Sequence, residues 1–99
     1  MTISEANWKH FKKIRLIALD RYCTAVLQQA QEICGSESSS SHERYLKLYL
    51  LIQERNKAMK FPFDGLSRSS APLKLKVMCD MGLVTDEEMQ GFSESLRSR

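Results

Sequence analysis

Three cysteines and two histidines are the side chains in this 99-residue chain that could bind a metal ion or supply a nucleophile and a base. Cys23, Cys34, His42 and Cys79 follow one another at separations of 11, 8 and 37 positions. Structural zinc sites take their ligands in close pairs, typically with about two to five residues between the two members. No such pair exists here, so the sequence predicts neither a metal site nor a cofactor.

A catalytic role for Cys79 would need a group that deprotonates its thiol. His10 and His42 are the available bases, but no short spacing connects either of them with Cys79. The adjacent Asp80 would raise the pKa of the thiol, whereas a nucleophilic cysteine needs a lowered pKa. Buried thiols on amphipathic helices are the simpler interpretation for all the cysteines. We therefore expect no enzyme, and keep a small enzyme as an alternative.

A candidate anion site lies before a predicted helix. Arg68, Ser69 and Ser70 precede this helix, and Lys74 lies one turn into it. Backbone N–H groups at a helix start, together with hydroxyls and cations, can bind a phosphate or a carboxylate. The competing interpretation is that the serines only cap the helix.

The longest predicted element is a helix over residues 5–34. Its apolar side chains recur at separations that fit a period of 3.6 residues, and neither Gly nor Pro interrupts them. Ser4 and Gly35 mark its two ends. A second apolar edge lies about 90° from the first, so this helix is expected to touch two neighbours. The first stripe contains Trp8, Phe11, Leu19, Tyr22, Val26 and Ile33, and the second edge contains Leu16, Cys23, Leu27 and Cys34.

Three further helices are predicted over 41–60, 70–81 and 85–96. We expect an all-α fold in a single domain, residues 1–99: a small four-helix bundle built on a long antiparallel helical hairpin. A helix of about 28 residues spans roughly 42 Å, whereas a compact domain of this size has a radius of gyration of about 13 Å. The first helix must therefore break or extend beyond a compact monomer.

Local signals set the ends of these three helices. Ser40 with Glu43, and Thr85 with Glu88, have the spacing of capping boxes. Pro62 is expected to end the 41–60 helix. Residues 73–77 alternate as a strand would, but no other segment could pair with such a strand, so a helix is favoured there.

Surplus apolar surface predicts an interface. Arg15 lies near the centre of the first stripe, where a desolvated guanidinium needs a partner unless this part of the helix is exposed. Leu46 and Leu50 lie outside the main stripe of their helix. A homodimer or another protein partner would cover such surface. The predicted interface residues are Trp8, Phe11, Arg15, Tyr22, Leu46 and Leu50.

The stretch from Leu73 to Met81-Gly82-Leu83-Val84-Thr85-Asp86-Glu87-Glu88-Met89 resembles the short C-terminal helical-hairpin tails, of the SHOCT type, that many bacterial proteins carry. The similarity covers about a quarter of the chain and stops at residues 91–99, which lack the lysine-rich helix of those tails. The resemblance implies association rather than catalysis.

Nucleic-acid binding is an alternative function. The net charge is +3, and a basic cluster runs from Lys9 to Arg15. The predicted corner at 73–96 also has the form of a helix-turn-helix. However, the acids at 86–88 would repel phosphates at the start of its second helix, so the sequence argues against nucleic acid as the main partner.

The composition, with 42% hydrophobic and 27% charged residues, is typical of globular proteins. The longest apolar run, residues 48–52, is much shorter than the roughly 20 residues that span a membrane. The N-terminal residues 1–8 have no pattern of a secretory signal. We expect a small cytoplasmic protein–protein interaction module, an adaptor or regulator that self-associates, with no membrane partner.

Overall fold

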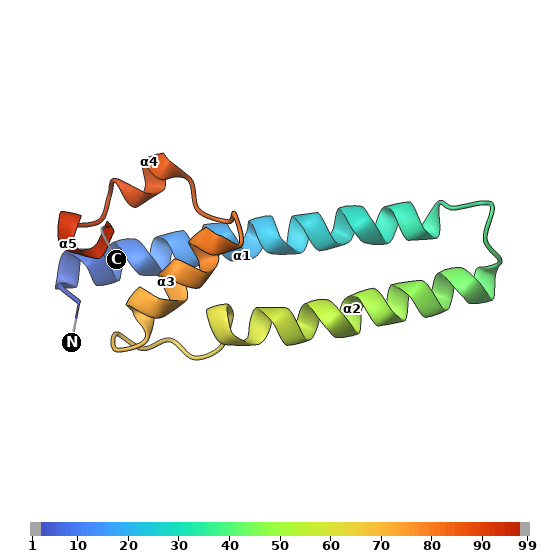
Figure 1. The fold of residues 1–99 in the computed structure, drawn as a ribbon, viewed down its shortest axis with the longest axis horizontal. Helices are drawn as coiled ribbons and strands as arrows, with labels where there is room; N and C mark the ends of the chain where they lie inside the picture. The colour runs from blue at the N-terminus through green and yellow to red at the C-terminus, as the bar shows by residue number, and fades with distance from the viewer. Residues whose placement is uncertain (1–2, 98–99) are drawn as a thin grey trace.

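The structure is a computed structural model that describes residues 3–97, and these residues form helices without strands. Three helices are long, and two near the C-terminus are single turns (Figure 1). The all-α class is confirmed. The elements are α1 (Glu5–Cys34), α2 (Ser41–Phe63), α3 (Ala71–Asp80), α4 (Asp86–Met89) and α5 (Glu94–Arg97).

Both ends of α1 lie where the sequence predicts them. The Ser4 hydroxyl accepts a hydrogen bond of 3.1 Å from the Asn7 amide, which satisfies one of the free N–H groups of the first turn. The Gly35 amide closes the last turn on the Gln31 carbonyl at 2.9 Å. Ser40 and Glu43 start α2 with the predicted capping box.

Helix α2 continues to Phe63, three residues beyond its predicted end. The prediction was wrong because Pro62 lies within the last turn instead of ending the helix. Pro62 and Phe63 are both buried, and the Phe63 ring packs at 5.9 Å from the Tyr22 ring of α1. Apolar burial of this size, worth about 1.5–3 kcal/mol for a large side chain, offsets the cost of a proline near a helix end.

The segment 71–80 is a helix, so the helical prediction for residues 73–77 is confirmed. The alternating pattern there is misleading. Lys74 is buried with its ammonium group on backbone carbonyls, 2.5 Å from that of Gly65, while Leu73 is exposed. Ala71, Leu75 and Met78 are the residues through which α3 enters the core.

A fourth helix over 85–96 is not formed by the described residues. The capping box of Thr85 and Glu88 is present, but α4 ends after one turn. Gly91 then passes so close to α1 that a Cβ atom on it would lie 2.3 Å from the His10 ring. The interruption lets Phe92 reach the core, which a straight helix at this distance from α1 would prevent. The predicted four-helix bundle is thus replaced by three long helices and two turns.

The core occupies only one end of the molecule. Helices α1 and α2 lie side by side and run in opposite directions, and α3, α4 and α5 cover α1 only near its N-terminal half (Figure 1). The molecule measures 52 × 24 × 18 Å, so α1 extends beyond the core instead of breaking. The core residues are Phe11, Ile14, Ala18, Tyr22, Phe63, Ala71, Leu75, Met78, Leu83, Phe92 and Leu96.

We call residues 23–34 of α1 and 41–59 of α2 the arm. No residue of the arm is buried, although several side chains between its two helices are half-buried. Within residues 3–97, none of the helices has an apolar stretch long enough to cross a membrane.

Met78→Ala tests where the stability resides. Met78 is fully buried, so this change should lower the free energy of unfolding by about 2–5 kcal/mol. Leu50→Ala, at an exposed site on the arm, should change it by less than about 0.5 kcal/mol in the monomer. Urea denaturation followed by circular dichroism at low protein concentration measures both. Equal losses in the two variants would contradict a core confined to one end.

Candidate interaction surface

The structure separates the predicted interface residues into two groups. Phe11 and Tyr22 belong to the core of the chain itself, and the Tyr22 hydroxyl donates a 2.7 Å hydrogen bond to the Arg55 carbonyl. Their side chains are thus packed within the chain itself, and their part in an interface stays a prediction. Leu46 and Leu50 are exposed on α2.

Trp8 is half-buried at the N-terminal end of α1. Its ring stacks on Phe11 with 6.0 Å between centroids. The charged ends of Lys12 and Arg68 each lie 5.5 Å from the centroid of the Trp8 ring. Cation–π contacts of this kind hold the indole in place, so Trp8 mainly joins the start of α1 to the segment before α3.

Arg15 finds its partner inside the chain. Its guanidinium donates a hydrogen bond to the carbonyl of Phe63, the last residue of α2. The C-terminus of a helix carries free carbonyls and a partial negative charge, both of which favour a cation. The predicted need for a partner is therefore met without an interface, and Arg15 instead fixes the end of α2 against α1.

The residues of the candidate anion site lie in one short segment, but their charges are already engaged. Arg68 forms an ion pair with Glu5, and the hydrogen bond from Arg68 lowers the pKa of the Glu5 carboxyl. Lys74 donates to the backbone carbonyls of Asp64 and Gly65.

The serine hydroxyls of this segment are bonded to one another. Ser70 lies 2.7 Å from the hydroxyl of Ser67, and Ser69 lies 3.4 Å from it. The expected N-cap contact of Ser70 is absent, since its side chain accepts no hydrogen bond from the first turn of α3. The arrangement stabilises the turn between α2 and α3.

The cysteines differ from the expectation that all three are buried. Cys23 and Cys34 are exposed on the arm, and only Cys79 is partly buried. Burial, together with the neighbouring Asp80, raises the pKa of the Cys79 thiol, which keeps the thiol protonated. Within the part of the chain that the structure describes, no three Cys, His, Asp or Glu side chains gather as metal ligands.

A strap formed by residues 82–97 runs along α1 toward its N-terminal end and is held there by polar contacts. Arg21 binds the Glu88 carboxylate through two hydrogen bonds of 2.6 and 3.0 Å and also reaches the Leu83 carbonyl at 2.9 Å. Asn7 exchanges two hydrogen bonds with Ser93, at 2.8 and 3.0 Å. The strap therefore closes the core from the side opposite to α2.

An uncharged apolar face remains open on the arm. Tyr45, Ile52 and Met59 follow one another at separations of seven positions, so they form one line along α2. On α1 the second apolar edge continues this surface, since Cys23 and Leu27 line the same groove as Ile52 and Met59. We define the arm face as Cys23, Leu27 and Cys34 of α1 with Tyr45, Tyr49, Ile52 and Met59 of α2.

The arm face has large exposed side chains around a groove. Leu27, Tyr45 and Tyr49 are 62%, 67% and 57% exposed. The groove between the helices has a volume of about 190 Å³ and is lined by Tyr22, Cys23, Val26, Leu27, Ile52, Arg55, Asn56 and Met59. A shallower hollow at the tip of the arm is lined by Cys34, Ser41, Arg44, Tyr45 and Leu48.

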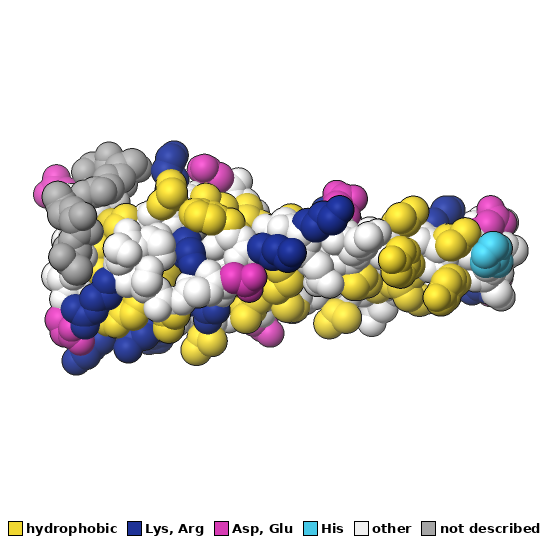
Figure 2. All heavy atoms as spheres, turned by 90° about the horizontal axis from the view of Figure 1, so that it is seen from below, with side chains coloured by type: hydrophobic (Ala, Val, Ile, Leu, Met, Phe, Trp, Pro, Cys, Tyr) yellow, Lys and Arg dark blue, Asp and Glu magenta, His cyan; other side chains and the backbone are white. Residues whose placement is uncertain are grey.

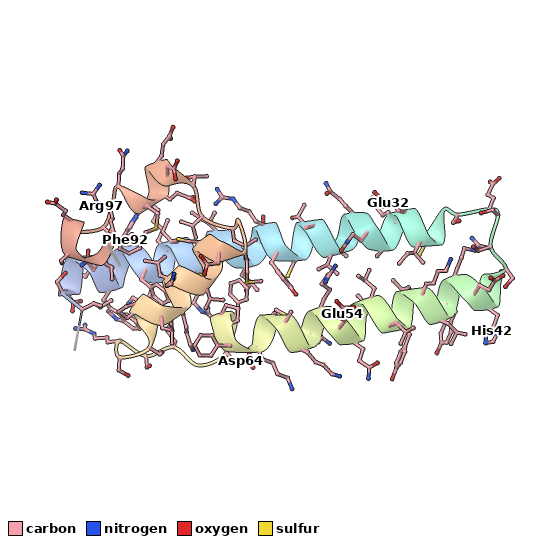
Figure 3. The ribbon with its side chains drawn as sticks, viewed as in Figure 1. Glu32, His42, Glu54, Asp64, Phe92 and Arg97 are labelled. Atoms are coloured by element: carbon pink, nitrogen blue, oxygen red, sulfur yellow. The ribbon has the colours of Figure 1, made fainter. Side chains whose placement is uncertain are left out.

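Hydrophobic side chains gather along the arm as far as its tip (Figure 2), where His42 lies (Figure 3). The buried ring of Phe92 lies at the other end of the molecule (Figure 3). The arm thus exposes apolar side chains away from the packed core, while Leu16, Phe61, Leu66 and Leu73 are exposed near the core.

Part of this surface is visible in the sequence, because the second edge of α1 is an apolar row at helical spacing. Of the predicted interface residues, none belongs to the arm face except through the neighbouring position of Tyr22 in its groove. The useful signal was that two adjacent helices each carry an apolar row free of charged residues.

No protein-family model, curated protein or solved structure matches this chain, including the segment that resembles the SHOCT-type tails.

Glu88→Gln tests the strap. The hydrogen bonds from Arg21, and then those from Thr85, lower the pKa of the Glu88 carboxyl from 4.5 to about 2. A carboxyl with a lowered folded-state pKa stabilises the fold above its unfolded pKa and loses this contribution as the pH falls toward the folded value. The wild type should therefore lose more stability between pH 5 and pH 2.5 than Glu88→Gln does.

At pH 7 the substitution should cost about 1 kcal/mol. Glu87→Gln, at the adjacent exposed position, is the control and should behave as the wild type does. Urea denaturation at several pH values measures the difference. Parallel pH profiles for the wild type and Glu88→Gln would show that the ion pair does not hold the strap.

Proposed function

We propose that this chain is a small cytoplasmic protein–protein interaction module, an adaptor or regulator, that self-associates through the arm face. The observation that carries the proposal is the exposed arm face itself: seven uncharged, mostly large side chains from two adjacent helices, around a groove of about 190 Å³. Soluble monomers rarely leave a contiguous apolar surface of more than a few hundred Å² open to water.

The composition of the arm face supports this proposal. The buried centres of protein interfaces are depleted of charged residues and enriched in aromatic ones. Tyr45 and Tyr49 supply the aromatic rings, and no member of the face carries a charge. Burying a large apolar side chain that is exposed in the monomer contributes about 1.5–3 kcal/mol, and several such residues from each copy must first offset the free-energy cost of association.

The position of the arm face also supports it. No residue of the arm belongs to the core, so a partner can cover the arm without disturbing the packing around Met78. The interface can therefore form between folded chains, as an adaptor requires.

Nucleic-acid binding stays a second candidate, supported by the exposed lysines Lys9, Lys12 and Lys13 near the N-terminal end of α1. Two features of the structure weaken this second candidate. Arg15 is turned toward Phe63, and the expected helix-turn-helix corner has only the single turn of α4 where a recognition helix would lie. Any binding would then be electrostatic and strongly dependent on salt.

The mass of the native protein is the first test of self-association. Light scattering at micromolar concentration should give twice the chain mass of 11.4 kDa. Leu27→Glu, which places a charge on the arm face, should reduce the mass to that of the monomer because a desolvated carboxylate would lie in the interface.

Leu50→Glu is a matched control, since Leu50 is 60% exposed and Leu27 is 62% exposed. Leu50 points away from the arm face, so this variant should remain a dimer. Circular dichroism checks that both variants stay helical. A dimer lost in Leu50→Glu and kept in Leu27→Glu would move the interface to Leu46 and Leu50, and a monomeric wild type would refute self-association.

A binding assay with duplex DNA separates the second candidate from the first. Under the preferred proposal, the protein should show no retention on DNA at 150 mM salt, about the physiological value. Retention that is lost in a Lys12→Glu, Lys13→Glu variant, but kept in Leu27→Glu, would instead favour the basic end of α1 as the functional surface.

A further inference from the structure

We infer that the groove of the arm face receives the Tyr45 ring of a second copy, in an antiparallel two-fold dimer whose two arms form a four-helix bundle. This inference rests on the proposed self-association and adds the occupant of the groove and the direction of the partner. It follows from the size of the groove, the place of Tyr45, and the charges of the surface.

The groove fits one aromatic side chain. An engineered protein cavity of about 150 Å³ with apolar walls binds benzene, and this groove has about 190 Å³. Its walls come mainly from Val26, Leu27, Ile52 and Met59, with little polar surface exposed. A tyrosine can place its ring among such side chains while its hydroxyl stays at the wet edge.

The ring must come from another molecule. Tyr45 is 67% exposed and lies on the same line of α2 as Ile52 and Met59. The α2 residues of the groove are centred near positions 55–56, about ten residues or 15 Å along the helix. This separation is beyond the reach of the Tyr45 side chain of the same chain.

An antiparallel arrangement fills both grooves at once. In a two-fold dimer the same surface patch serves both copies. If the arms run in opposite directions, the tip of each arm lies over the groove of the other, and the axis passes near Tyr49 and Ile52, midway between Tyr45 and the groove. A parallel arrangement would place ring beside ring and groove beside groove, and both grooves would stay empty.

The charge pattern permits a contact between the arm faces of two copies. A two-fold interface brings each face against itself, so a charged face would repel its copy. None of the seven residues that define the arm face is charged, and Glu43, Lys47, Glu54 and Lys57 lie at other positions around α2. Arg55 also lines the groove, but its guanidinium bonds to Gln29 and Glu54 of the same chain.

The arm face supplies about half of a standard interface in projection alone. From Tyr45 to Met59 it extends about 21 Å along α2, and two adjacent helices are about 18 Å wide. The product is about 380 Å², and the relief of the side chains makes the accessible area larger. A standard interface takes roughly 800 Å² from each partner.

Cross-linking tests this arrangement because Cys23 lines the groove. We would introduce Tyr45→Cys into a Cys34→Ser, Cys79→Ala background. Mild oxidation should link the introduced thiol to Cys23 of the second copy and give a covalent species of twice 11.4 kDa. The product should disappear when Cys23→Ser is added. Leu50→Cys in the same background, on another side of α2, should give no such link.

Affinity provides a second measurement that does not depend on the thiol. Tyr45→Ala should weaken the dimer at least about tenfold, as expected for a central aromatic anchor, whereas Tyr45→Phe and Leu50→Ala should change it by less than about threefold. Sedimentation equilibrium across a concentration series measures these values, and circular dichroism confirms that each variant is folded.

Two results would overturn the inference. A stable wild-type dimer in which Tyr45→Ala is neutral and the Cys23 link does not form would refute this arrangement while leaving self-association intact. A wild type that stays monomeric at all concentrations would refute both and would leave the groove to an amphipathic helix of a different protein.

Discussion

Helix α1 has 30 residues and is therefore about 45 Å long, and a third layer covers only part of it. Among the described residues, α3 and the strap contact α1 as far as Arg21 and Tyr22. Beyond Tyr22, α1 has no buried residue and lies beside α2. The molecule is thus divided into a core, where α1 is covered by further elements, and an arm, where it pairs with α2.

The polar contacts determine which half is covered. Arg15 binds the end of α2, Arg21 binds Glu88 of the strap, and Tyr22 bonds to the backbone of α2. All three lie in the first two-thirds of α1. Beyond Tyr22 the helix has no buried residue, and its outer positions carry glutamines and alanine. The N-terminal part of α1 thus has the residues of a helix that is covered by a third layer. The part after Tyr22 has those of a helix that packs on a single neighbour.

Local signals explain why the helix ends were predictable and the packing was not. Ser4, Ser40 and Thr85 act through residues three positions away, so the sequence contains both partners of each contact. The end of α2 and the interruption at Gly91 depend instead on contacts with α1, across more than 40 positions.

The place of Phe11 and Tyr22 in the chain's own core has the same origin. A stripe with Phe11 and Tyr22 has the same pattern whether a second copy or the chain's own α3 and α2 cover it, because periodicity shows that a face is buried and not by which element. Arg15 was expected to need a partner, and it has one, but a backbone carbonyl has no sequence signature.

Two surfaces of the arm expose leucines, and they differ in the number of charged residues around them. This difference favours one of them as the interface. Leu46 and Leu50 form a short row on one helix, and Lys47, Glu54 and Lys57 share that helix's outward side. A partner there would have to desolvate these charges to bury two leucines. The desolvation of the charges costs more free energy than the burial of the leucines contributes. On the arm face the rows of two helices adjoin, and the groove between them adds depth. Arg55 is the charged residue in the lining of this groove, and its guanidinium bonds to Gln29 and Glu54. Burial of the apolar rows around it therefore desolvates fewer charges. Each arm has two helices of a four-helix bundle, and a second arm would provide the other two.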